Sequence, residues 1–198
     1  MRGPTLVALG LALSCASVLH AQQARKPAPP RSLELALSEE TLQVRYLDST
    51  TIAGQANSEV AYALFLSEDR DVVGSAGVMM DTDLDFGLLE VKLGPQAYAG
   101  LLRDENNDVF ALAVGAQLRF NLIPERDIAL TGYAFYSPDV LTFGSADNLK
   151  DFMVRAEIRL GKRVEGFAGY RWFELDLLER QTRRLQNELF LGLSYELR

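Results

Sequence analysis

The stretch DFMVRAEIRLG, from Asp151 to Gly161, has a strict two-residue hydrophobic period. Its apolar residues occupy every second position from Phe152 to Leu160. The positions between them carry Met153, Arg155, Glu157 and Arg159. A period of two is typical of a β-strand, because successive side chains of a strand point to opposite faces. The stretch therefore predicts a strand with one apolar face and one charged face.

Two further stretches, residues 111–121 and 187–197, repeat this period. Each of the three is about 11 residues long, which suits a tilted strand that crosses a bilayer. Strands of soluble domains are usually shorter, at about 5–6 residues. The strand lengths therefore favour a membrane protein built from strands.

The pattern as a whole predicts an all-β fold, namely an up-and-down antiparallel transmembrane β-barrel of ten strands over residues 32–198. An even number of strands brings both ends of a bacterial barrel to the same side of the membrane. Eight strands is the alternative, because the first two candidates are short and could merge or stay outside the sheet. The expected strands cover residues 32–38, 42–47, 58–67, 72–80, 86–102, 109–121, 127–137, 150–160, 164–176 and 186–197.

The connections differ in character on the two sides of the expected barrel. Short connections at residues 122–126 and 161–163 are predicted to be turns on one side. Longer or more polar connections at residues 103–108, 137–149 and 178–185 are predicted to be loops on the other. The pair Gly94-Pro95 interrupts the fifth strand.

Alternation alone does not say which face of each strand points inward. A membrane barrel turns its apolar face to lipid, whereas a soluble barrel buries it. A soluble periplasmic barrel that binds an apolar ligand is therefore the alternative, and Val114 and Ile158 would be buried in it. Aromatic residues near strand ends favour the membrane barrel, since they are expected to form an interfacial girdle. These are Tyr133, Phe135, Tyr136, Tyr170, Trp172 and Phe173.

The N-terminus has the order of a secretory signal peptide: Arg2, an apolar run, then small residues up to Ala21. Cleavage is expected after Ala21, and residues 22–31 (QQARKPAPPR) are predicted to be a Pro-rich flexible leader. Lipid attachment at Cys15 is the alternative, although the usual Leu three residues earlier is missing.

Loss of residues 1–21 removes Cys15 and His20, the only cysteine and the only histidine. Catalysis by Ser-His or Cys nucleophiles is then excluded, as are zinc sites with His or Cys ligands. Two Asp-rich stretches, which start at Asp81 and Asp104, lack the Gly and Glu that a calcium loop needs. We expect no catalytic residues, no metal and no cofactor, and we expect that the chain is not an enzyme.

The remaining chain has 19 basic and 27 acidic residues, a net charge of −8. Such a chain is a poor nucleic-acid binder, because that binding depends on neutralising phosphates with Lys and Arg. Several charges instead fall on the polar faces of the expected strands. Inside a narrow barrel they should pair with one another, because an unpaired buried charge is costly. The predicted lumen charge network is Arg119, Arg155, Glu157, Arg159, Arg171, Glu188 and Glu196.

Three segments resemble the YfaZ family of outer-membrane proteins: FALAVGAQLRFNL (Phe110–Leu122), YAFYSPDVL (Tyr133–Leu141) and GYRWFELD (Gly169–Asp176). The Tyr-Ser-Pro-Asp and Gly-Tyr-Arg pieces carry most of the resemblance. Membership would imply a small β-barrel in the bacterial outer membrane, which supplies a location rather than an activity.

The end of the chain resembles the terminal strand by which barrel assembly machinery recognises its clients. Gly192, Tyr195 and Leu197 carry this predicted assembly signal, although such strands most often finish on Phe and this chain finishes on Leu197-Arg198. The expected partners are therefore the lipid bilayer, lipopolysaccharide and, during biogenesis, the barrel assembly machinery. The expected role is structural, adhesive or weakly conducting.

Overall fold

The computed structural model describes residues 31–52, 55–82, 87–103, 107–177 and 182–197. The predicted signal peptide and nearly all of the predicted leader lie outside the described residues. No helix among the described residues is long and apolar enough to cross a membrane.

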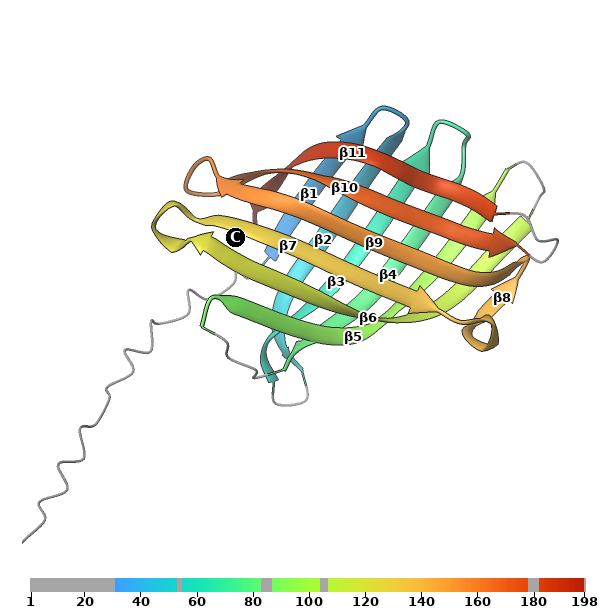
Figure 1. Cartoon of the computed structure of the whole chain (residues 1–198), viewed down its shortest axis with the longest axis horizontal. Helices are drawn as coiled ribbons and strands as arrows, with labels where there is room; N and C mark the ends of the chain where they lie inside the picture. Colours follow the sequence, from blue (N-terminus) through green and yellow to red (C-terminus); the bar gives the residue numbers. More distant parts are fainter. Residues whose placement is uncertain (1–30, 53–54, 83–86, 104–106, 178–181, 198) are drawn as a thin grey trace, which may run out of the picture.

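Ten long strands form one closed antiparallel barrel (Figure 1). Each pairs with its sequence neighbours, and the barrel closes where β1 pairs with β11. The prediction of ten strands is confirmed, and the eight-stranded alternative is wrong. A short extra strand, β8 (Thr142–Gly144), pairs with β6 between β7 and β9. The ten strands are β1 (Arg31–Ser38), β2 (Thr41–Ile52), β3 (Gln55–Ser67), β4 (Val72–Asp81), β5 (Leu89–Leu102), β6 (Asn107–Ile123), β7 (Ile128–Ser137), β9 (Ala146–Arg159), β10 (Val164–Leu177) and β11 (Thr182–Glu196).

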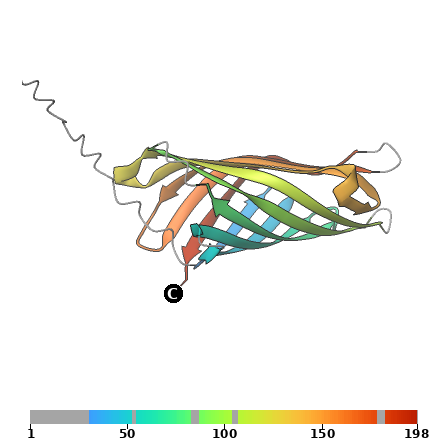
Figure 2. The same ribbon diagram turned by 90° about the horizontal axis from the view of Figure 1, so that it is seen from below.

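Both ends of the barrel domain lie at one end of the barrel, which we call the terminal end. There the Leu197 amide donates a hydrogen bond of 2.9 Å to the Arg31 carbonyl. The connection through the 3-10 helix η1 (Pro124–Arg126) lies at the same end, as do the residues between β9 and β10. The opposite end, called the loop end, carries the 3-10 helix η2 (Asp139–Leu141) and β8. Figure 2 shows how strongly the strands tilt between the two ends.

Several strands run further than the apolar pattern predicted, among them β2, β9 and β11. β2 continues to Ile52 instead of ending at residue 47, and β11 begins at Thr182 instead of residue 186. The first three of the added residues at the start of β11, Thr182 to Arg184, are polar, so the hydrophobic alternation does not reveal them. Backbone pairing with β10 continues there all the same, from Arg183 opposite Leu175 to Thr182 opposite Asp176.

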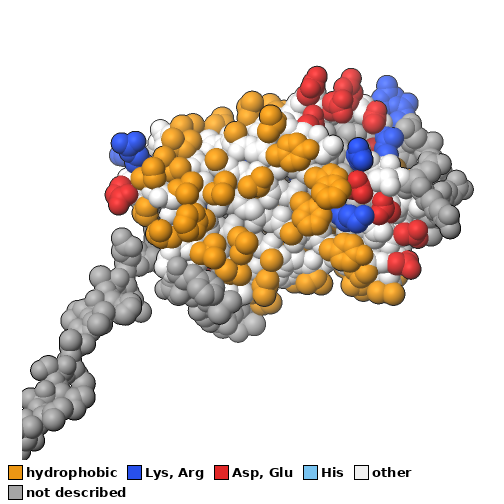
Figure 3. All heavy atoms as spheres, viewed as in Figure 1, with side chains coloured by type: hydrophobic (Ala, Val, Ile, Leu, Met, Phe, Trp, Pro, Cys, Tyr) orange, Lys and Arg blue, Asp and Glu red, His pale blue; other side chains and the backbone are white. Residues whose placement is uncertain are grey.

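In most of the long strands the apolar face points outward. Val114 is 63% exposed and Ile158 is 45% exposed, whereas Arg155 and Glu157 between the apolar positions of β9 are buried. Hydrophobic side chains accordingly spread over the middle of the barrel wall, and charged ones gather toward its ends (Figure 3). The soluble alternative required Val114 and Ile158 to be buried, so it is wrong.

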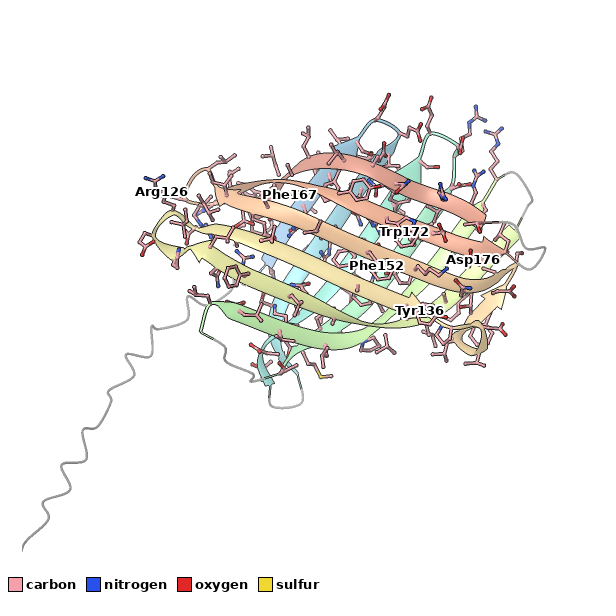
Figure 4. The ribbon with its side chains drawn as sticks, viewed as in Figure 1. Arg126, Tyr136, Phe152, Phe167, Trp172 and Asp176 are labelled. Carbon is pink, nitrogen blue, oxygen red and sulfur yellow. The ribbon has the colours of Figure 1, made fainter. Side chains whose placement is uncertain are left out.

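The predicted aromatic girdle is half right. Tyr136, Tyr170 and Trp172 are exposed on the outer wall, and Trp172 stacks on Phe152 with ring centroids 5.5 Å apart (Figure 4). Phe135 and Phe173 are buried inside the barrel instead, and Tyr133 packs against the same interior. Residues next to each other in a strand face opposite sides, so Phe135 and Tyr136 cannot both face lipid.

An arginine on the lipid-facing wall tests this orientation. Val114→Arg is expected to destabilise the folded barrel by about 2–4 kcal/mol, because the charge would lie in the apolar part of the bilayer. Urea titration of barrels refolded in lipid vesicles measures the change. Gln117→Arg in the same strand is the control, because Gln117 lines the interior and the new charge would stay hydrated. Equal losses in the two variants would contradict the orientation.

Candidate functional site: the barrel interior

The interior toward the loop end is filled by an apolar plug of fifteen buried residues. Its aromatic rings meet from strands that are not neighbours. The Phe173 ring of β10 lies 5.7 Å from the Phe65 ring of β3 and 5.8 Å from the Tyr98 ring of β5, measured between centroids. Because these contacts cross the barrel, the plug fills its cross-section at that level. The plug comprises Phe65, Val73, Met79, Tyr98, Leu102, Val109, Ala111, Ala113, Phe135, Ala146, Leu149, Phe173, Leu175, Leu177 and Leu185.

An ion pair lies directly against this plug. Arg171 donates two hydrogen bonds of 2.8 Å to the two oxygens of Asp151, and both side chains are buried. The Tyr98 hydroxyl donates to Asp151 from β5 at 2.9 Å. The Arg171 guanidinium also lies 4.6 Å from the Phe173 ring centroid and 5.3 Å from that of Phe65, as in cation–π pairs. A bidentate, charge-assisted pair of this kind fixes both side chains.

Further from the plug, four charged side chains form a continuous chain. Arg155 donates to the two oxygens of Glu34 at 2.8 and 2.9 Å and to Glu157 at 2.8 Å. The other Glu157 oxygen lies 2.6 Å from Arg119 Nη1. The Phe167 ring lies 4.5 Å from the Arg155 guanidinium and covers it. Glu34, Arg155 and Glu157 are all buried, so their ion pairs offset the cost of removing each charge from water.

Phe167 can lie there because Gly192 faces it from β11. The two residues are directly paired, and a Cβ on Gly192 would come within 2.3 Å of the ring. Gly115 and Phe135 form the same arrangement between β6 and β7. Small residues on the inner face thus provide the space that the interior aromatic rings occupy.

The structure distributes the seven predicted lumen charges over four places. The chain of charges just described contains Arg119, Arg155 and Glu157. Arg171 lies outside this chain and pairs with Asp151. Arg159 pairs with Glu196 at 2.7 Å and with Asp127 at 2.9 Å near the terminal end. Glu188 lies away from all of these and accepts a hydrogen bond from the Ser38 hydroxyl.

Sequence reasoning missed several interior charges, among them Glu34, Arg45, Glu59, Lys92 and Asp151. Their signal was the same alternation. Glu34 lies between the outward-facing Leu33 and Leu35. Arg155 lies in the same way between the outward-facing Val154 and Ala156. Lys92 and Arg45 both approach Glu59, at 3.4 and 3.5 Å.

The three residues of the predicted assembly signal lie on β11 or directly after it. Tyr195 is exposed on the outer wall, Gly192 faces inward under Phe167, and Leu197 is bonded to Arg31 through its backbone. Their recognition by assembly machinery stays a prediction.

A cavity of about 420 Å³, here called the vestibule, occupies the interior toward the terminal end. It reaches the rim of the barrel, since Gly87, Pro124 and Asp127 line it. Its acidic lining residues are Glu34, Glu59, Glu90, Asp127, Glu157, Glu165 and Glu196. The cationic lining consists of Arg45, Lys92, Arg119, Arg155 and Arg159.

The vestibule narrows sharply toward the plug. The next void, lined by Tyr133, Met153, Arg155 and Arg171 among others, measures only about 20 Å³. A void of this size admits a single water and no larger solute. Among the described residues no group of three or more acidic, His or Cys side chains could hold a metal ion.

A closed antiparallel barrel with an apolar outer wall and a charged interior defines a transmembrane β-barrel protein. The YfaZ precursor family matches residues 13–196, and the chain belongs to this family. The resemblance found in the sequence is thereby confirmed.

Two solved structures match the chain at low sequence identity. A chain described as a bacterial polysaccharide outer membrane secretin is 12% identical, with a TM-score of 0.50 over 80% of this chain. The outer membrane channel DcaP of Acinetobacter baumannii is 10% identical, with a TM-score of 0.42 over 83% of this chain. This chain covers 56% and 54% of those two chains, so it spans just over half of their length. No match is found among curated proteins.

Proposed function

We propose that this protein is a structural barrel of the bacterial outer membrane whose interior is closed to solutes at the loop end. Its vestibule then faces the periplasm, because the termini of bacterial barrels lie on that side. Membership of the YfaZ precursor family and the apolar outer wall support the location. In this proposal the protein is neither an enzyme nor a pore.

The apolar plug is the observation that carries the proposal. An open channel needs a continuous hydrated path, and small barrels lose that path when their own side chains fill the interior. Here Phe65, Tyr98 and Phe173 meet across the barrel, and the void beneath them holds no solute larger than water. Of the three expected roles, a weak pore is therefore the least supported.

The outer wall near the loop end supports contacts with the outer leaflet. Tyr136, Phe152 and Trp172 are labelled on the outer wall in Figure 4, and in the proposal their rings contact the lipid of that leaflet. Beyond Trp172, toward the loop end, Lys150 pairs with Asp176 at 2.8 Å, and Arg184 is two-thirds exposed. In the proposal these cations meet the phosphates of lipopolysaccharide, and β11 is the strand that the assembly machinery binds during biogenesis.

The location is tested by fractionating a Gram-negative host that expresses the full chain. We expect the protein in the outer-membrane fraction, with a gel mobility that changes when the sample is boiled. Recovery of the folded protein from the inner membrane or from the soluble periplasm would refute the location.

Conductance tests the closed interior. We expect the purified wild-type barrel to give no steady current in planar bilayers, because the plug leaves no hydrated path. The double variant Phe65→Ala/Phe173→Ala removes two rings that meet across the plug and should produce measurable steps of current. Phe152→Ala is the control, since it removes a ring of the outer wall and should leave the bilayer silent. Steady current through the wild-type barrel would refute the closed interior.

A further inference from the structure

The vestibule has an excess of negative charge. Seven carboxylates and five cationic side chains line it, so two negative charges remain uncompensated when all groups are ionised. All five cations already have carboxylate partners: Arg155 and Arg159 each hold two at 2.7–2.9 Å, and Arg119 holds Glu157 at 2.6 Å. The balance of charge therefore favours a cationic ligand over an anionic one.

Two of the carboxylates have only long ion pairs. Glu165 lies 4.0 Å from Arg119, whose guanidinium is much closer to Glu157. Glu59 lies 3.4 Å from Lys92 and 3.5 Å from Arg45. Both carboxylates are largely removed from solvent, with side-chain exposures of 17% and 12%. Each can still accept hydrogen bonds from an ammonium group, which offers three donors.

The size and mixed lining of the vestibule suit an organic ligand. A cavity of about 420 Å³ lies within the range of about 300–1,000 Å³ that is common for small-molecule sites. Leu47, Leu89, Ile128 and Met153 provide apolar wall between the charged groups. An alkyl chain with ammonium groups would bring its methylenes against these residues and its charges to the carboxylates.

We propose that the vestibule binds a small aliphatic polyamine, with Glu165 and Glu59 as ammonium acceptors. The inference rests on the proposed function, because a periplasm-facing vestibule that ends at the plug is a binding site and not a passage. The ligand enters from the periplasmic side and leaves by the same route.

Spermidine is the probe for this site. Isothermal titration of the folded full-length protein in detergent micelles should show saturable binding of one spermidine per barrel. Glu165→Gln keeps the shape of the side chain and removes its charge, so it should weaken binding about tenfold, as expected for the loss of one partly screened charge contact. Glu59→Gln should weaken binding to a similar extent.

Glu125→Gln is the matched control. Glu125 is an exposed residue of η1 at the same end of the barrel and does not line the vestibule. Its loss should leave spermidine affinity unchanged. The gel mobility shift on boiling shows that each variant is folded before titration.

Three outcomes would overturn the proposal: no saturable binding of spermidine, equal weakening by Glu165→Gln and Glu125→Gln, or saturable binding of citrate in place of spermidine. These failures are distinct from failure of the proposed function, which conductance and fractionation measure. A barrel that conducts can still bind spermidine, and a silent barrel can fail to bind it.

Discussion

Arg155→Met is expected to destabilise the folded barrel by about 3–5 kcal/mol, because removing one partner of a buried ion pair leaves the other charge uncompensated. Glu34 would lose both of its hydrogen bonds, and its remaining cationic neighbour, Arg45, lies 3.9 Å away. Glu157 would keep only Arg119. Methionine keeps an unbranched apolar stem but lacks the guanidinium that lies against the Phe167 ring, so the loss includes that contact as well. Urea titration in lipid vesicles, followed by the disappearance of the folded gel band, measures the loss.

The double variant Arg155→Met/Glu34→Gln separates charge from packing. If the uncompensated Glu34 carboxylate causes most of the loss, neutralising it should recover a large part of the stability. Glu34→Gln alone leaves Arg155 with Glu157 and should fall between the wild type and Arg155→Met. Two results would show that this chain of charges does not hold the barrel together. One is a double variant that is less stable than Arg155→Met. The other is an Arg155→Met variant whose stability lies within about 1 kcal/mol of the wild type, the upper range for an exposed ion pair.

Local alternation explains why the strands could be predicted and the ion pairs could not. The two-residue period predicts that Arg155 and Glu157 lie on the same face, because both belong to one strand. Its other partner, Glu34, lies 121 residues away on β1. Which strands face each other at a given height depends on the tilt and stagger of all ten strands, and no single stretch of sequence contains that information.

The plug was missed for a related reason. Phe173 and Phe135 stand next to the outward-facing Trp172 and Tyr136, and all four are aromatic. Aromatic composition near a strand end therefore suggested a girdle for the whole group. Strict counting in steps of two would have placed Phe173 inside with Arg171. That the interior rings meet across the barrel could be known only from the closed structure.

The interruption at Gly94-Pro95 was visible in the sequence, but its role was not. Pairing between β4 and β5 stops at Gly77 opposite Gln96 and resumes at Met80 opposite Leu93. Pairing between β5 and β6 continues without a break, with Gly94 opposite Gly115. The irregularity at Gly94 and Pro95 therefore lies on the β4 side alone. Proline has no backbone N–H to donate, and β4 is not paired with β5 at this point, so no hydrogen bond between the strands is lost.

Gly94→Ala is expected to prevent assembly or to destabilise the barrel by more than about 4 kcal/mol, which places it among the most damaging single substitutions. A Cβ at this position would lie 1.8 Å from the Val78 carbonyl oxygen and 2.8 Å from the Val78 carbonyl carbon. Both atoms belong to the backbone, so no side-chain rotation relieves the clash. β4 and β5 would have to separate, and unpaired backbone groups in the bilayer are costly. Refolding yield in vesicles, read from the folded gel band, measures the effect.

Gly161→Ala is the control for this prediction. Gly161 lies in the turn between β9 and β10, its φ is not positive, and no atom lies within 4 Å of the added Cβ. This variant should fold in the same yield as the wild type, so a loss specific to Gly94 would be due to the close approach of Val78. Normal folding of Gly94→Ala would mean that the β4–β5 wall can open at this point without loss. In that case the irregularity at Gly94-Pro95 would be a tolerated gap and not a requirement of barrel closure.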